Sequence, residues 1–333
     1  RERRRDASKS ILNLDPPDHT RLRRLVSKAF TPSAIEMLRP MVQHYVDEAL
    51  QAADLRVRNG GTFELIDDVA FPVPFLVISA MLGMPIERAE ELRDWSQVIT
   101  RTLEPTVGMD DIEQADAAFA QLLPFLDEVI AERRTNLGSD MLSSLISAEE
   151  SGDKLTAEEL VTFVVLLYIA GHETTVNLIG NSMLALLRAP DELAYARQHG
   201  LSPNAIDELL RFDGPVQHTV RVPVVPVQFQ VGDRTIEVAP GERVLTSLGA
   251  ASHDPSVFDN PHRLDLRRSN ANKHLGFAAG THYCLGFALA KLEAQVAIES
   301  LLQRYAHIEL ADEPIWRDRL TIRGVDRLAL AVA

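Results

Sequence analysis

The feature that most restricts the fold is a long apolar segment with a marked start, at residues 156–188. Thr156 followed by Glu159 has the spacing of a capping box, in which each side chain accepts a hydrogen bond from the other residue's backbone N–H. The segment therefore predicts the longest apolar helix in the chain. Its longest apolar stretch, residues 160–171 with Thr162 included, has 12 residues, short of the ~20 that a membrane-spanning helix needs.

Helical spacing also marks most of the chain before residue 214. Thr31-Pro32-Ser33 with Glu36 indicates a helix start, in which the carboxylate reaches back to the first turn. Apolar residues then recur at helical spacing from Ile35 to Leu50, and Asn59-Gly60-Gly61 ends the run. Further helices are expected over 86–103, 111–136, 190–199, 203–212 and 286–305.

After Gly214-Pro215 the apolar period changes from 3.6 residues to two, which is typical of strands. Residues 225–231 and 236–238 flank Gly232-Asp233 and predict a hairpin. Residues 252–281 have little periodicity and are expected to form a loop, with short strands near 307–310 and 327–332. We expect one mainly α domain over 1–333 with a minor β part.

Composition excludes several classes of protein. Of 333 residues, 46% are hydrophobic and 25% charged, the mixture of a soluble globular protein. A single cysteine excludes an internal disulfide framework and any cysteine-cluster metal site. The net charge of −14 argues against a nucleic-acid binder. Residues 1–28 are the exception, with nine bases against four acids, so they form either a basic patch for an acidic partner or a solvated segment.

The lone cysteine, Cys284, is the first candidate for chemistry. It ends a long loop, lies at the threshold of the last helix and is surrounded by Gly276, Gly280 and Gly286. A helix start offers unpaired N–H donors and the positive end of the helix dipole, so the thiolate form is expected to be favoured. Such a thiolate suits a nucleophile or a metal ligand; the alternative is a small buried hydrophobe.

The run Phe277-Ala278-Ala279-Gly280-Thr281-His282-Tyr283-Cys284-Leu285-Gly286 resembles the haem-binding loop of the cytochrome P450 family. In that family the cysteine thiolate is the axial ligand of the haem iron, and the resemblance gives this role to Cys284. It implies haem b as the cofactor and a P450 fold. The family usually has a glycine where this chain has Ala278. Residues 289–293 also resemble the family.

A second stretch, Ala170-Gly171-His172-Glu173-Thr174-Thr175, resembles the family's oxygen-binding segment. By this resemblance Ala170 and Gly171 leave room beside the helix, and Glu173 and Thr174 form the catalytic pair that delivers protons. The competing interpretation of His172-Glu173 as the start of a zinc-binding HExxH motif fails, because position 176 is valine.

Two further stretches agree with the family. Glu208-Leu209-Leu210-Arg211 resembles its acid–x–x–arginine motif, whose two charged residues form a structural pair. His19 and Arg23, four residues apart, resemble the pair that binds the haem propionates. The other propionate partners would be Arg221 and His282. Phe277, Gly280 and Gly286 complete the expected cofactor-binding residues.

The resemblance implies a soluble, cytoplasmic, bacterial-type haem-thiolate monooxygenase. It would hydroxylate or epoxidise an apolar small molecule of lipid, terpenoid, steroid or polyketide type. The substrate pocket would include Leu167, Val216 and Gln217 beside Ala170 and Thr174, under a lid at residues 102–110. Electrons would come from an NAD(P)H-dependent reductase through a ferredoxin that docks on residues 21–28. We expect a monomer without nucleic-acid or membrane partners.

Alternatives remain at this point. One is a haem-binding protein without turnover, and another is a P450 that performs peroxide-driven oxidation or phenol coupling. The chain begins at Arg1, just before the expected propionate-binding helix, whereas family members normally carry an additional amino-terminal part. We therefore expect it to be an amino-terminally incomplete P450 domain.

Overall fold

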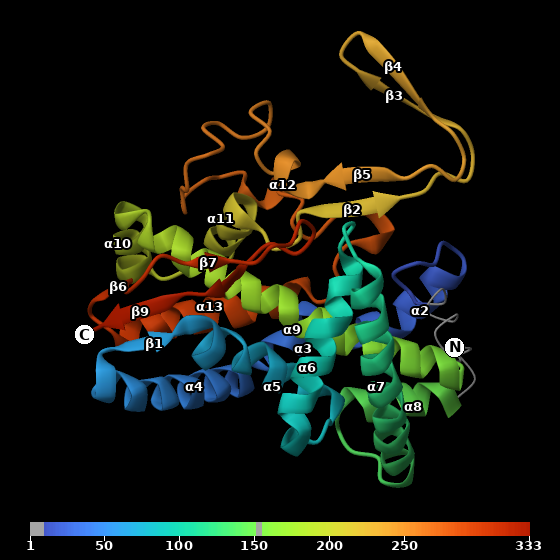
Figure 1. The fold of residues 1–333 in the computed structure, drawn as a ribbon, viewed down its shortest axis with the longest axis horizontal. Coiled ribbons are helices and arrows are strands. Elements are labelled where there is room, and N and C mark those ends of the chain that lie inside the picture. Colours follow the sequence, from blue (N-terminus) through green and yellow to red (C-terminus); the bar gives the residue numbers. More distant parts are fainter. Residues whose placement is uncertain (1–9, 151–154) are drawn as a thin grey trace.

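A computed structural model of the chain describes residues 10–150 and 155–333. Residues 1–9, which carry five of the nine basic residues of the amino-terminal segment, lie outside the described part. Helices dominate, and a long hairpin projects away from the helical body (Figure 1). The helices are α2 (Asp18–Ser27), α3 (Pro32–Glu36), α4 (Arg39–Gly60), α5 (Pro72–Leu82), α6 (Ala89–Thr100), α7 (Met109–Thr135), α8 (Met141–Glu150), α9 (Ala157–Leu187), α10 (Pro190–His199), α11 (Pro203–Asp213), α12 (Leu248–Ala251) and α13 (Phe287–Arg304).

The long helix α9 runs through the middle of the protein, where α5, α11 and α13 pack against it. It starts as the sequence predicts: the Glu159 N–H donates to Thr156 Oγ1 over 3.1 Å, and the Thr156 N–H donates to Glu159 Oε2 over 2.8 Å. By length and composition alone α9 could cross a membrane, yet 67% of its most apolar window is buried inside the protein. It is therefore the central core helix of the fold.

The strands form four small antiparallel sheets. β9 lies between β1 and β6, with Leu330 opposite both Phe63 and Leu310. The predicted hairpin is confirmed as β3 and β4, joined by Gly232 with a φ of 58°. The strands are β1 (Thr62–Glu64), β2 (His218–Arg221), β3 (Val227–Val231), β4 (Arg234–Val238), β5 (Val244–Ser247), β6 (Ile308–Leu310), β7 (Ile315–Trp316), β8 (Val325–Arg327) and β9 (Ala329–Val332).

The expected helix start at Thr31 is confirmed, but the expected role of Glu36 in it is wrong. Thr31 Oγ1 accepts from the Ala34 N–H over 3.3 Å, and a short helix α3 ends at Glu36 before α4 begins. The Glu36 carboxylate does not reach back to the helix start and pairs instead with the Arg39 guanidinium. Glu36 lies five residues beyond Thr31, whereas a capping box needs three.

Candidate active site

The loop that carries Cys284 is closed by its own backbone. The Cys284 N–H donates to the Phe277 carbonyl over 3.0 Å, and the Tyr283 N–H donates to the Gly280 carbonyl over 3.1 Å. Gly280 has a φ of 73°, which glycine adopts readily. The Phe277 ring is buried beneath the loop, 6.2 Å from the Phe287 ring on α13. These contacts hold the cysteine in place just before α13.

Gly286 lies two residues after Cys284 and forms the amino-terminal cap of α13, which begins at Phe287. Ala278 lies on the opposite side of the loop and has a φ of 58°. This is the left-handed region, which residues with a Cβ rarely adopt. The loop thus keeps the turn for which the family usually uses glycine, at the expense of backbone strain at Ala278.

Burial opposes the effect that the helix start was expected to have on the pKa of the Cys284 thiol. Burial raises the pKa of the Cys284 thiol above its ordinary value. The Gly286 backbone N–H and the Arg23 charge lower that pKa, but burial outweighs both. A metal ion that coordinates a partly buried thiol of this kind displaces its proton, because the sulfur binds the metal as a thiolate. The donor therefore fits an iron ligand better than a free nucleophile.

Four basic side chains predicted to bind the haem propionates converge beside this loop. The His19 and His282 rings lie 4.3 Å apart between centroids, and Arg23 Nη2 donates to the Tyr283 carbonyl over 2.6 Å. Burial lowers the pKa of both histidines, and the Arg221 charge lowers the pKa of His282 further. These donors from three distant parts of the chain fit a dianionic cofactor, because two carboxylates would compensate the gathered positive charge. Together with Cys284 they match the needs of haem.

On α9, the residues of the predicted oxygen-binding segment have different surroundings. Ala170 is exposed and Thr174 is half-buried, and Thr174 Oγ1 donates to the Ala170 carbonyl over 3.1 Å. Gly171 faces α5, where a Cβ would lie 3.1 Å from Ile78 Cγ1. The small size of Gly171 therefore serves the close packing of α9 on α5.

Glu173 is buried, with a side chain only 1% exposed, and its carboxylate faces two arginines. Arg317 pairs directly with Glu173 Oε1, and Arg319 Nη1 lies 3.7 Å from the same oxygen. Both arginines follow β7, near the carboxyl terminus. No local sequence pattern indicated them, because their partner lies more than 140 positions earlier in the chain.

His172 has a structural environment. Its Nδ1 lies 2.8 Å from the Tyr168 carbonyl and its Nε2 lies 3.1 Å from Ser96 Oγ, which connects α9 to α6. Burial lowers the pKa of His172, so the neutral ring is favoured. Among residues 10–150 and 155–333, no group of three or more histidine, cysteine or acidic side chains could hold a metal ion.

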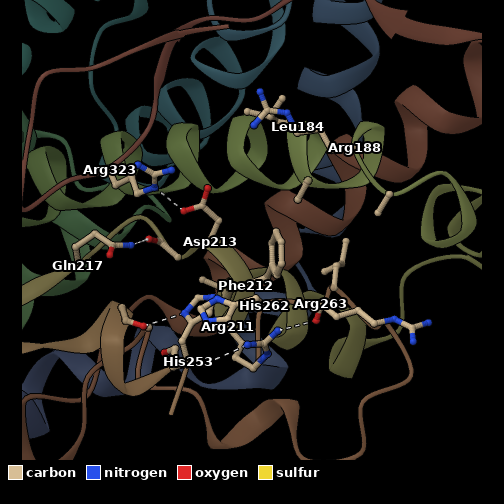
Figure 2. Close-up of a pocket in the computed structure, with 18 of the residues that line it drawn as sticks. Leu184, Arg188, Arg211, Phe212, Asp213, Gln217, His253, His262, Arg263 and Arg323 are labelled. Atoms are coloured by element: carbon tan, nitrogen blue, oxygen red, sulfur yellow. Dashed lines mark hydrogen bonds and ion pairs between the residues drawn. The ribbon is translucent and has the colours of Figure 1, made fainter. Parts of the chain in front are cut away.

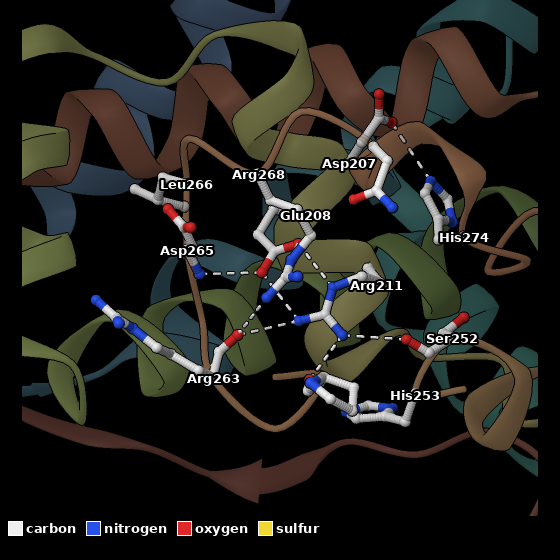
Figure 3. A network of polar contacts seen from close by, with 12 residues as sticks. Asp207, Glu208, Arg211, Ser252, His253, Arg263, Asp265, Leu266, Arg268 and His274 are labelled. Carbon is white, nitrogen blue, oxygen red and sulfur yellow. Dashed lines mark hydrogen bonds and ion pairs between the residues drawn. The ribbon is translucent and has the colours of Figure 1, made fainter. Parts of the chain in front are cut away.

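The predicted pair Glu208–Arg211 is buried at the centre of a larger network (Figure 3). Arg211 Nε donates to Glu208 Oε2 over 2.7 Å, and Arg268 Nε donates to the same oxygen over 3.0 Å. Arg211 also donates to the carbonyls of Ser252 and Pro261, at 3.0 and 2.7 Å. The network fastens the loop that precedes the cysteine to α11, and sequence reasoning missed Arg268.

The three residues expected in the substrate pocket belong to two elements of the fold: Leu167 lies on α9, and Val216 and Gln217 follow α11. Leu167 is a buried core residue of α9. Val216 and Gln217 line a cavity of about 790 Å³ beyond the carboxyl-terminal half of α9 (Figure 2). The side chain of Gln217 is held there by a hydrogen bond of 2.7 Å that its Nε2 donates to the Gly214 carbonyl. Among the described residues, the lining of this cavity includes Arg211 and Asp213 but neither Leu167 nor Thr174.

Comparisons with known proteins agree with this site. A family model for cytochrome P450 matches residues 1–199 and 201–320. Cytochrome P450 107B1 of Saccharopolyspora erythraea is 42% identical over 97% of this chain and 77% of its own length. Cytochrome P450 monooxygenase PikC of Streptomyces venezuelae is 40% identical over 96% of this chain and 75% of its own length.

Among solved structures, P450BioI in complex with an acyl carrier protein ligated to hexadec-9Z-enoic acid has a TM-score of 0.90 at 38% identity. The match covers 98% of this chain and 82% of that one. The mainly α fold with a minor β part is that of the same family. The chain belongs to the cytochrome P450 family of haem-thiolate monooxygenases, and its cofactor is haem b.

Proposed function

We propose that this chain is one catalytic domain that inserts an oxygen atom from O₂ into an apolar small molecule. The observation that carries the proposal is the pair Glu173–Thr174, a buried carboxylate next to a half-buried hydroxyl in the middle of a mainly apolar helix. A helix that only packs has no need of this pair, because burying a carboxylate is costly. A site that delivers protons needs both groups.

When bound, the haem supplies the activation of O₂. The residues of this chain bind it and deliver protons: Cys284 Sγ is the iron ligand, and His19, Arg23, Arg221 and His282 hold the propionates. Glu173 Oε2 is buried and has no hydrogen-bond partner among the described residues. It is the carboxylate oxygen that takes up a proton and passes it toward Thr174 Oγ1.

We propose a long apolar chain as the first class of substrate to test. The support is the structure of P450BioI, which contains hexadec-9Z-enoic acid on its carrier protein. We further propose a cytoplasmic monomer that receives electrons from an NAD(P)H-dependent reductase through a ferredoxin. Arg24 on the exposed side of α2 contributes to the docking surface.

Replacement of Thr174 tests the oxygenation reaction. In Thr174→Ala, with hexadec-9Z-enoic acid, NADPH and a surrogate bacterial ferredoxin and reductase, we expect NADPH consumption to continue. Product per NADPH should fall at least about tenfold and hydrogen peroxide should rise, because a positioned proton-transfer group contributes roughly 10²–10⁴-fold. Thr162→Ala on the same helix is the control. If product formation stays fully coupled to NADPH consumption in Thr174→Ala, Thr174 does not deliver protons.

The electron-transfer surface has its own test. Arg24→Glu combined with Lys28→Glu should slow reduction by the ferredoxin, and the loss should diminish as salt screens the surface charges. Arg234→Glu on the projecting β4 strand is the control for a charge reversal elsewhere. Reduction rates that stay the same at every salt concentration would exclude this surface.

A haem-binding protein without turnover is the second candidate. The ion pairs of Glu173 with Arg317 and Arg319 favour this candidate. A carboxylate held by two arginines takes up a proton less readily and moves less readily toward Thr174. A spin-state change with hexadec-9Z-enoic acid followed by product formation rejects this candidate. Product formed with hydrogen peroxide in place of NADPH would instead indicate a peroxide-driven P450.

A further inference from the structure

The connection between α6 and α7, residues 101–108, contains one carboxylate that points inward. Leu103 is 49% exposed, whereas Glu104 is only 8% exposed. Its carboxylate accepts three successive backbone N–H groups, from Leu320 over 2.9 Å, Thr321 over 2.8 Å and Ile322 over 3.2 Å. Hydrogen bonds to a carboxylate are about twice as strong as neutral ones, so Glu104 is the main fastening of this connection.

The backbone that Glu104 binds is itself attached to the body of the protein. Residues 320–322 form the tip of the hairpin made by β7 and β8, the C-terminal hairpin. The Gln217 N–H donates to the Thr321 carbonyl over 2.9 Å, and Val216 forms a β-bridge with Ile322. The hairpin tip is therefore held by the body of the protein, and Glu104 binds the connection between α6 and α7 to it.

The same hairpin carries the two arginines that face the catalytic carboxylate. Arg319 directly precedes the first N–H bound by Glu104, and its Nη1 lies 3.7 Å from Glu173 Oε1. The same Arg319 Nη1 donates to Thr100 Oγ1, at the end of α6, over 3.3 Å. Burial lowers the pKa of Arg319, and the charges of Glu173 and Glu104 act in the opposite direction.

We propose that Glu104 latches the lid segment to the C-terminal hairpin, and that Arg319 links this latch to Glu173. Lid closure and the position of the proton-delivering carboxylate are then coupled. Glu104 and Arg319 are positioning residues, since they act through the hairpin backbone and through Glu173. The inference rests on the proposed function, because the lid and the proton route that it couples both belong to the proposed active site.

The latch has a direct test in hydrogen–deuterium exchange of the purified haem-loaded protein. In Glu104→Ala, and more weakly in the isosteric Glu104→Gln, we expect the amides of residues 320–322 to exchange at least about tenfold faster, because one lost charge-assisted bond corresponds to roughly that factor. Glu113→Gln on the exposed side of α7 is the matched control. Peptides from α13 report whether the core stays folded. Unchanged exchange at 320–322 in both variants overturns the latch.

The lid role is tested by ligands of different size. We expect 4-phenylimidazole to bind to and leave the haem at least about fivefold faster in Glu104→Gln, as in lid-gated entry. Cyanide, which is small enough to enter without lid movement, should bind at the wild-type rate. Stopped-flow absorbance follows both ligands. If 4-phenylimidazole also keeps its wild-type rates, Glu104 does not control a lid.

The link to Glu173 is tested in the reverse direction, because coupling between two sites is reciprocal. Glu173→Gln removes the charge that holds Arg319, and it should speed exchange at residues 320–322, more than 140 positions away in sequence. Arg319→Gln should do the same, and Arg319→Lys, which keeps the charge, should restore slower exchange. Wild-type exchange in Glu173→Gln overturns the coupling.

These outcomes are separable from failure of the proposed function. A protein that lacks the thiolate-bound haem spectrum fails as a monooxygenase, and the exchange rates of residues 320–322 still report on the latch in that same protein. A normal spectrum with unchanged exchange in the Glu104 variants refutes the latch alone.

Discussion

Ala278→Gly should stabilise the protein, although glycine substitutions usually destabilise. Ala278 has a φ of 58°, close to the ideal left-handed conformation. For a residue with a Cβ this conformation costs about 1–2 kcal/mol, which glycine avoids. Glycine loses more backbone freedom on folding, at about 0.5–1 kcal/mol. The difference predicts a gain of roughly 0.5–1 kcal/mol in the free energy of unfolding.

Urea unfolding of the haem-loaded protein, followed by far-UV circular dichroism, measures this gain as a higher midpoint at an unchanged slope. Ala279→Gly is the matched control in the same loop, since Ala279 has a φ of −152° and no strain to relieve. It should lose about 0.5–1 kcal/mol from backbone entropy alone. Equal losses in the two variants would refute the argument that the loop is strained at Ala278.

Three other substitutions test the buried charges and the cofactor site. Glu208→Gln leaves the guanidiniums of Arg211 and Arg268 without their shared carboxylate, so we expect a loss of about 3–5 kcal/mol in urea unfolding; a loss under about 1 kcal/mol would contradict a central role for the network. Burial raises the pKa of Glu293 well above its usual range. As pH rises above the ordinary pKa of a glutamate, the Glu293 carboxyl therefore ionises in the unfolded chain but stays protonated in the folded protein. The free energy of unfolding falls over this pH range, because the folded state binds more protons than the unfolded state. The advantage of Glu293→Gln over the wild type should therefore grow between about pH 5 and pH 8, by at most ~1.4 kcal/mol per pH unit; an advantage independent of pH would exclude this ionisation. Arg221→Gln should speed haem transfer to apomyoglobin about tenfold, because a charge-assisted bond is lost, and an unchanged rate would separate Arg221 from the propionates.

Local rules predicted the elements whose causes lie within a few residues. The start of α9 rests on Thr156 and Glu159, three positions apart, and the β3–β4 hairpin rests on its two-residue period and on Gly232. In both cases the residues that form the contact are near neighbours, so a pattern in the sequence suffices.

Helix α5 (Pro72–Leu82) was not among the expected helices. It is apolar on nearly all sides because it packs between other elements, so it lacks the one-sided spacing that indicates a helix. Pro72 and Pro74 also argue against a helix in the sequence. Both lie in the first turn of α5, where proline is tolerated.

The site shows the same limit. Motif spacing identified Cys284, Glu173 and the pair Glu208–Arg211, but it did not indicate Arg317, which pairs with Glu173, or Arg268, the second arginine that binds Glu208. Arg317 and Arg268 are 144 and 60 positions away from the carboxylates they bind, and only the fold brings them together.

The central claim is that Cys284 holds haem iron through its thiolate. The most direct measurement is the visible spectrum of the dithionite-reduced protein with and without carbon monoxide, for the wild type and for Cys284→Ser. We predict a strongly red-shifted Soret band in the wild type and its loss in Cys284→Ser. A wild-type band at the position typical of a neutral axial ligand, or no haem absorbance at all, would contradict the claim.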